Sequence, residues 1–131
     1  MSALLNFIVV DDSKLDCFIA EKIIKNTGRS ESVNTFQQAT DALVYIKTLP
    51  PTTIPTIVFV DIQMPVMNGF EFVEAFEALP ENIRQGYSIY MLSSSINEND
   101  IAKVKGYQSV RQFLNKPLTN NAITVVLNQH S

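Results

Sequence analysis

Residues 57–69 of this chain read IVFVDIQMPVMNG, and they decide the fold class. The apolar run Ile57–Val60 ends at Asp61, and the segment Met64–Gly69 that follows holds a proline and an Asn-Gly pair. Branched and aromatic residues favour a strand, and an apolar run without alternation is typical of a strand buried on both faces of a parallel sheet. Proline and Asn-Gly indicate a loop. The sequence therefore predicts an acidic side chain at the carboxyl end of a buried strand.

Apolar runs of this kind alternate with helical patterns along the chain. Strands are predicted over Leu5–Val10, Ser32–Phe36, Ile57–Val60, Ser88–Leu92 and Val110–Asn115. Helices are predicted from Ser13 to the stop signal Gly28, and over residues 40–49, 72–79, 99–107 and 122–127. Three prolines make residues 50–55 a stiff connection. Strict alternation of five strands with five helices implies an α/β domain with a parallel sheet, right-handed crossovers and helices on both faces.

The first predicted helix begins at Ser13, and Asp16 follows in the spacing of a capping box. Its apolar stripe is predicted from residues at helical spacing, which are Leu15, Phe18, Ile19 and Ile23. Cys17 is the single cysteine of the chain, so no disulfide forms within it. Because Cys17 lies near the apolar stripe, we expect a packed and unreactive thiol.

Length and charge narrow the range of functions. The 131 residues fit one domain, which we expect to span residues 1–131. A formal net charge of −3 argues against a general nucleic-acid-binding protein. The longest apolar runs are about one strand long, against the ~20 residues of a membrane span, and Met1–Leu5 lacks the features of a signal peptide. We therefore expect a cytoplasmic protein without membrane or nucleic-acid partners.

Polar and charged side chains follow four of the predicted strands. Asp11 and Asp12 follow the first, Asp61 the third, Ser93 the fourth and Lys116 the fifth. Ligands of such sheets bind outside the carboxyl ends of the strands, where the strand order reverses. In the order 2-1-3-4-5 the first and third strands flank that point, so the three carboxylates would converge there. Clustered carboxylates repel one another unless a cation enters, and a few carboxylates with water ligands suit Mg²⁺.

Four segments of the chain resemble the receiver domain of response regulators, the phosphoacceptor part of two-component signalling. They are Val9-Val10-Asp11-Asp12-Ser13, residues 60–69 (VDIQMPVMNG), Met91-Leu92-Ser93-Ser94 and Phe113-Leu114-Asn115-Lys116-Pro117. The resemblance implies a flavodoxin-like, doubly wound sandwich with a five-stranded parallel sheet in the order 2-1-3-4-5. It also implies a stand-alone, chemotaxis-regulator-like phosphoprotein that is not an enzyme. Such a protein accepts its phosphoryl group from a histidine kinase or a histidine phosphotransfer protein and signals through contact with a downstream protein.

The resemblance assigns metal and phosphoacceptor roles by position. Asp61 corresponds to the phosphoaccepting aspartate. Asp12 corresponds to a direct ligand of Mg²⁺, Asp11 to an acid that acts through water, and the backbone carbonyl of Gln63 to a third ligand.

The same resemblance assigns the residues around the phosphoryl group. Ser93 corresponds to the hydroxyl residue that bonds this group, and Lys116 to the lysine that pairs with it. Ser94 is the alternative if the register slips by one residue. Phe113 corresponds to a switch aromatic that acts with Ser93, although a structural strand residue is the competing interpretation. The peptide between Lys116 and Pro117 is expected to be cis.

The family's partner surface corresponds here to the helix predicted at residues 99–107, the fifth strand and the last helix. That last helix carries more apolar residues than one buried stripe needs, which suits a homodimer or another protein contact. The sequence departs from the family at Gln108-Ser109-Val110, where a Gly-Ala pair is usual, and at Ser93, where threonine is commoner.

Other interpretations of the same residues remain open at this point. The fold also serves proteins that dock without phosphorylation, phosphatases with an aspartyl nucleophile, and flavin-binding proteins. The phosphatases resemble a pattern with a second acid two residues after the nucleophile, where this chain has Gln63. Flavin binding would place a phosphate beside Asp11 and Asp12, which would repel it. Gly69 is expected to serve the turn, and His130 to lie in a frayed tail.

Overall fold

The computed structural model describes residues 3–50, 53–95 and 97–130 and contains one parallel sheet. Its strands are β1 (Leu5–Val10), β2 (Ser30–Phe36), β3 (Thr56–Asp61), β4 (Tyr87–Ser93) and β5 (Val110–Asn115). They pair in the order β2-β1-β3-β4-β5, and every pair is parallel. The predicted fold class and strand order are confirmed.

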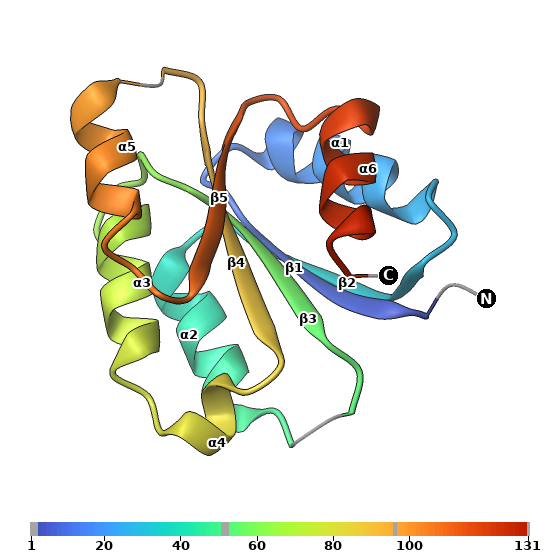
Figure 1. The fold of residues 1–131 in the computed structure, drawn as a ribbon, viewed down its shortest axis with the longest axis horizontal. Coiled ribbons are helices and arrows are strands. Elements are labelled where there is room, and N and C mark those ends of the chain that lie inside the picture. The colour runs from blue at the N-terminus through green and yellow to red at the C-terminus, as the bar shows by residue number, and fades with distance from the viewer. Residues whose placement is uncertain (1–2, 51–52, 96, 131) are drawn as a thin grey trace.

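Helices cover both faces of this sheet (Figure 1). They are α1 (Lys14–Lys25), α2 (Ala39–Thr48), α3 (Gly69–Glu77), α4 (Glu81–Arg84), α5 (Glu98–Val104) and α6 (Asn120–Asn128). Helices α1 and α6 lie together on one face, and α2, α3 and α5 lie on the other. Right-handed crossovers between parallel strands produce this division.

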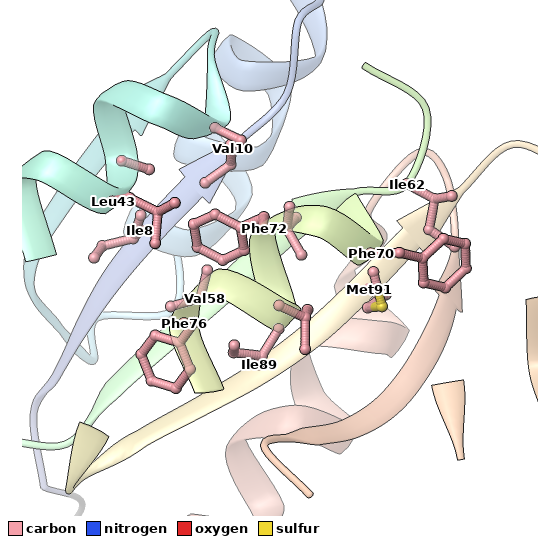
Figure 2. Close-up of a cluster of buried hydrophobic side chains, with 14 of the residues drawn as sticks. Ile8, Val10, Leu43, Val58, Ile62, Phe70, Phe72, Phe76, Ile89 and Met91 are labelled. Carbon is pink, nitrogen blue, oxygen red and sulfur yellow. The ribbon is translucent and has the colours of Figure 1, made fainter. Parts of the chain in front are cut away.

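The core has two halves because successive strand residues point to opposite faces of the sheet. On the α3 side, Figure 2 shows the rings of Phe72 and Phe76 over buried strand residues, which include Ile8, Val58 and Ile89. On the α1 and α6 side, the ring of Phe59 lies 6.3 Å from that of Phe7 and 5.7 Å from that of Tyr90, centroid to centroid. The apolar sequence of the central strands is thereby explained, since both faces are buried.

Two helices, α3 and α4, lie between β3 and β4 where the sequence predicts one. Helix α4 has four residues and follows Pro80. Proline suits the start of a helix because its fixed φ is helical and its missing N–H would have no partner there. The side chain of Arg84 donates to the carbonyl of Leu79 at 2.8 Å and holds this turn in place. A single turn is too short to show a periodic apolar pattern, so the prediction of five alternating helices is wrong.

The buried face of α1 also differs from the predicted stripe. Cys17, Ala20 and Ile24 are buried, whereas Leu15 and Phe18 are 66% and 63% exposed. Small side chains at the contact let the helix lie close to the sheet, and the larger apolar residues turn outward as a result. Burial raises the pKa of the Cys17 thiol to about 11, so it stays protonated at neutral pH, in agreement with the expected unreactive thiol.

His130, the last described residue, is packed against the fold, so the expectation that it lies in a frayed tail is wrong. The Nε2 atom of His130 lies 3.1 Å from the hydroxyl of Tyr90, and its backbone carbonyl accepts from the Arg29 guanidinium at 3.4 Å. Burial lowers the pKa of His130. On the preceding helix α6, Val125 remains 46% exposed while its apolar neighbours are buried, as the surplus of apolar residues predicted.

Some expectations fall outside the described residues. The predicted stiff connection includes Pro51 and Thr52, and the predicted absence of a signal peptide includes Met1 and Ser2, all of which lie outside them. Among the helices that the structure describes, none combines the length and hydropathy needed to cross a membrane.

Candidate functional site

Three carboxylates meet at the carboxyl ends of β1 and β3, which are neighbours in the sheet. Asp11 and Asp12 directly follow β1, and Asp61 is the last residue of β3. Each contributes an oxygen atom, and these atoms all lie within 4.8 Å of one another. Asp11 and Asp61 are buried, and Asp12 is exposed. We call these three residues the acidic cup, and it forms where the sequence predicts it.

Backbone N–H groups orient the two buried carboxylates of the acidic cup. One oxygen of Asp11 accepts from the N–H of Ser13 at 2.9 Å, and one oxygen of Asp61 accepts from the N–H of Gln63 at 3.3 Å. The segment around Gln63 therefore lies directly beside Asp61, while the Gln63 side chain is exposed.

Lys116 extends its ammonium group into the acidic cup from the end of β5. Its Nζ atom lies 2.9 Å from Asp11 and 3.3 Å from Asp61. The peptide between Lys116 and Pro117 is cis, as the resemblance implies, and the backbone N–H of Lys116 donates to the carbonyl of Ser93 at 2.9 Å. The lysine side chain is 13% exposed, so its charge interacts with the carboxylates in a partly desolvated setting.

A fourth acid, Asp16, joins the site, and the sequence analysis missed it. Its carboxylate lies 2.9 Å from the Nζ atom of Lys116. The predicted capping box is half formed: Ser13 accepts from the N–H of Asp16 at 3.2 Å, but the N–H of Ser13 bonds Asp11 instead of Asp16. The helical spacing that suggested a cap also places Asp16 on the first turn of α1, which faces the strand ends. The place of Asp16 in the first turn of α1 is the sequence signal that could have identified it as part of the site.

Burial and mutual repulsion set the protonation behaviour of the site. Burial raises the pKa of Asp11, and burial together with the neighbouring Asp11 charge raises the pKa of Asp61. Burial alone would lower the pKa of Lys116, but its hydrogen bonds to Asp11 and Asp16 outweigh burial and raise it. Three carboxylates contact the ammonium group of Lys116, and Asp12 lies near two of them. The resulting excess of negative charge is one that a divalent cation would neutralise.

Ser93 lies at the same edge of the sheet, as the last residue of β4. It is buried, and its hydroxyl donates to the carbonyl of Ser95 at 2.9 Å. Ser94 is exposed beyond the strand end, whereas Ser93 is buried at the site. The structure therefore favours Ser93 over Ser94 as the hydroxyl residue of the site. Phe113 is half-buried on β5 and packs against the core half under α3.

The loop after Asp61 returns the chain closely past the strand end. A Cβ atom on Gly69 would lie 2.6 Å from the carbonyl oxygen of Asp61 and 2.8 Å from the Cα of Ile62. Gly69 is therefore needed for close approach of α3 to β3, which corrects the expectation that it serves the turn. The turn itself is centred on Val66, whose φ is +69°.

Comparison with known proteins identifies the family. A family model for the response regulator receiver domain matches residues 7–128. The chain belongs to the response regulator receiver domain family. A response regulator receiver protein from Dyadobacter fermentans is 35% identical, with a TM-score of 0.85 over 95% of this chain and 96% of that one. A two component response regulator from Cytophaga hutchinsonii is 27% identical, with a TM-score of 0.87 over 97% and 96%.

Curated relatives of this receiver domain differ in length. Protein PilG of Pseudomonas aeruginosa is 32% identical over 132 residues, which cover 96% of this chain and 87% of PilG. The sensor histidine kinase CheAY of Helicobacter pylori is 28% identical over 122 residues, and the chain spans 14% of that protein. The chain likewise spans 20% and 28% of two protein-glutamate methylesterases. Receiver domains act in two-component and chemotaxis signalling, generally as phosphoacceptors rather than catalytic enzymes.

The donor set of this receiver domain fits the Mg²⁺ that is standard for its family. All three residues of the acidic cup offer carboxylate oxygens, the ligand type that Mg²⁺ prefers, and the exposed Asp12 leaves a side open for water ligands. Among the described residues, Lys116 is the cation that contacts these carboxylates, and the negative charge that remains still favours a metal cation.

Proposed function

We propose that this receiver domain accepts a phosphoryl group on Asp61 from a histidine kinase or a histidine phosphotransfer protein, with Mg²⁺ bound by the acidic cup. The observation that carries the proposal is the position of the Asp61 carboxylate. It lies in a carboxylate cluster suited to a cation and 3.3 Å from the Lys116 ammonium group.

The transfer needs an attacking oxygen and the neutralisation of negative charge. A carboxylate oxygen of Asp61 attacks the phosphorus atom, the phosphorus–nitrogen bond to the donor imidazole breaks, and its electron pair stays on the ring nitrogen. Because an anion attacks an anion, catalysis is mainly positioning and charge neutralisation. The N–H of Gln63 orients Asp61 for this attack, and Lys116 stabilises charge that develops on the phosphoryl oxygens.

Asp11, Asp12, Asp61 and the carbonyl of Gln63 would hold Mg²⁺, which would supply positive charge to offset the repulsion between the carboxylates and the phosphoryl group. The chain's own contribution is to hold these oxygens together in spite of their repulsion. The backbone N–H groups of Ser13 and Gln63 stabilise the two buried carboxylates in their charged form.

The new phosphoryl oxygens offer acceptors that Ser93 lacks in the free protein. Its hydroxyl now donates to the Ser95 carbonyl, so exchange of that bond for one to the phosphoryl group releases the loop after β4. Phe113 lies on the neighbouring strand and responds to the space that opens. A bonding change at one strand end thereby alters the surface of α5, β5 and α6, where we propose contact with a downstream protein or a second copy.

The phosphodonor protein contacts α1 in this proposal. Leu15 and Phe18 are the exposed large apolar side chains of this helix, which begins beside the acidic cup. Exposed aromatic and aliphatic side chains next to a reactive site are typical anchors of a protein contact.

The test is phosphorylation by acetyl phosphate with Mg²⁺, followed by intact-protein mass spectrometry. We expect the wild type to gain the mass of one phosphoryl group and to lose it in hydroxylamine. Asp61→Asn should gain none, whereas Asp41→Asn, which changes an exposed acid in the first turn of α2, should match the wild type.

Equal phosphorylation of wild type and Asp61→Asn would overturn the assignment of Asp61. Failure of the wild type to react with acetyl phosphate, or to bind beryllofluoride with Mg²⁺, would favour the alternative of a receiver-like module that docks without phosphorylation.

A further inference from the structure

A second concave site lies at the opposite end of the sheet from the acidic cup. The cavity has a volume of about 610 Å³ and lies between the first residues of β1–β4, the end of α2, and α4. Figure 1 shows α4 beside the end of α2, below the starts of β3 and β4. Thr56 and Asp61 are the two ends of β3, so the cavity is roughly 16 Å from the acidic cup along the strand. Its volume lies within the usual range for small-molecule sites.

The floor of the cavity is a row of polar residues across four strands. The register pairs Ser32 with Asn6, Asn6 with Thr56, and Thr56 with Tyr87. The next row on this face is apolar across the central strands, with Ile8, Val58 and Ile89. Strands buried on both faces are normally apolar along their whole length. Thr56 in this row is buried, whereas Asn6, Ser32 and Tyr87 are half-buried, so a ligand in the cavity can reach their polar groups.

Several hydrogen-bonding groups that line the cavity have no protein partner within the described residues. Asn6 accepts from the Ser32 hydroxyl at 2.7 Å, which leaves its amide N–H₂ group free to donate. Asn34 donates to the Tyr45 hydroxyl at 2.9 Å, which leaves its carbonyl oxygen free to accept. The hydroxyl of Tyr87 takes part in no hydrogen bond in the described part of the chain. Donors and acceptors are thus both available.

The lining is uncharged. None of the described residues around the cavity is Asp, Glu, Lys, Arg or His. Burial and the neighbouring Tyr45 raise the pKa of Tyr87, so its hydroxyl stays neutral at physiological pH. The rings of Tyr45 and Tyr87 and the side chains of Ile46 and Ile83 supply the apolar part of the lining. A charged ligand would lose its hydration without gaining an opposite charge.

We propose that this cavity, which we call the amino-end pocket, binds an uncharged, planar heteroaromatic molecule that carries an amide or amino group. Its edge donates to and accepts from Asn6, Asn34 and Tyr87, and its face packs on the aromatic and aliphatic lining. Nicotinamide represents this class, and nicotinate is its matched anionic control with almost the same shape.

The test is titration of ¹⁵N-labelled protein with each probe, followed through the backbone amide resonances. A fragment of this size in a fitting pocket binds with a dissociation constant on the order of 10 mM or tighter. Nicotinamide should shift the resonances of residues in the polar row, and nicotinate should bind at least ~10-fold more weakly. Tyr87→Phe removes a hydroxyl without a protein partner, so it should keep the fold and weaken nicotinamide ~3–10-fold.

Controls separate this pocket from the acidic cup. Tyr107→Phe, outside the pocket, should leave nicotinamide affinity unchanged, and so should Asp61→Asn, which abolishes phosphorylation. Ser32→Leu fills the pocket and should remove binding. Absence of shifts in the polar row, equal affinity for nicotinamide and nicotinate, or unchanged affinity in Tyr87→Phe would each overturn the proposal, whatever the outcome at Asp61.

Discussion

The ammonium nitrogen of Lys116 lies 2.9 Å from a carboxylate oxygen of Asp16, closer than its 3.3 Å approach to Asp61. Asp16 thus competes with Asp61 for the Lys116 ammonium group, and it does so from a helix rather than from a strand end. The ammonium group of Lys116 lies between the carboxylates of Asp11, Asp16 and Asp61, and each of them limits how freely it moves toward a phosphoryl group.

We expect Asp16→Asn to be phosphorylated by acetyl phosphate about two- to tenfold faster than the wild type, which corresponds to ~0.4–1.4 kcal/mol of the barrier. The substitution releases Lys116 and removes a negative charge that repels the donor. The measurement is the initial rate at saturating Mg²⁺. Asp41→Asn removes the same charge from an exposed helix start and should react like the wild type. A rate for Asp16→Asn at or below that control would contradict the competition.

Removal of charge at Asp61 should stabilise the metal-free protein at neutral pH. The pKa of Asp61 and of Asp11 lies above the usual aspartate value of 3.8, chiefly because of burial. The folded state therefore binds protons more tightly than the unfolded state. This contribution to stability is complete below pH 3.8 and is lost as pH rises through the folded-state pKa values.

In the presence of a chelator, Asp61→Asn should raise the free energy of unfolding at pH 7 by ~1 kcal/mol, with a smaller gain at pH 4. Lys116 keeps Asp11 and Asp16 as partners in this variant, so no ammonium group is left unpaired. Urea unfolding at both pH values measures the difference. A wild type that is more stable than Asp61→Asn at pH 7 without divalent ions would refute the expectation.

Gly69→Ala should destabilise the protein by ~1–3 kcal/mol, because the added methyl would lie 2.6 Å from the backbone of Asp61. The clash also displaces the phosphoacceptor, so phosphorylation should slow in the folded fraction. Gly106→Ala is the matched control, since the methyl group added there would lie 3.4 Å from the carbonyl oxygen of Lys103. Denaturant unfolding of both variants measures the contrast, and equal stabilities would disprove close packing at Gly69.

Val66→Asn should stabilise the protein by ~1 kcal/mol. Val66 is 86% exposed, has a φ of +69° and is bridged by a hydrogen bond from the N–H of Met67 to the carbonyl of Pro65. Such a γ-turn is strained, and asparagine tolerates positive φ far better than a branched residue. Thermal unfolding measures the shift. Val44→Asn, on the exposed side of α2, should lower the melting temperature slightly, and a fall of similar size at Val66 would argue against strain.

Phe18→Ser should slow phosphorylation by a cognate kinase or phosphotransfer protein by ~10-fold while the rate with acetyl phosphate stays unchanged. The reason is that Phe18 is 63% exposed on α1 and has no place in the chemistry at Asp61. Val44→Ser, at a residue 60% exposed on α2, controls for loss of apolar surface. An equal loss of rate with the protein donor and with acetyl phosphate, or no loss with either donor, would contradict the proposal that the phosphodonor protein contacts α1.

The spacing of apolar residues was sufficient to predict a helix or strand wherever the pattern extends over several residues. The central strands are apolar without interruption because both of their faces are buried, so their number and parallel arrangement were predictable, although β3 and β4 each extend one residue beyond the predicted end. Their order was predicted from the resemblance to receiver domains and not from periodicity. Helix α4 was missed because one turn after Pro80 carries no period. The outward position of Leu15 and Phe18 was missed because fit against the sheet, and not hydropathy, selects Cys17 and Ala20 for the contact.

The sequence alone determined the chemistry available at the strand ends: three acids, a serine and a lysine, placed there by the alternation of strands and helices. The tertiary structure alone decided that Asp16 shares Lys116 and that five polar strand residues line an uncharged pocket. Both depend on which residues of separate elements face one another. Strand register and the rotation of each helix about its axis determine which of these residues are in contact, and no local sequence pattern specifies either of them.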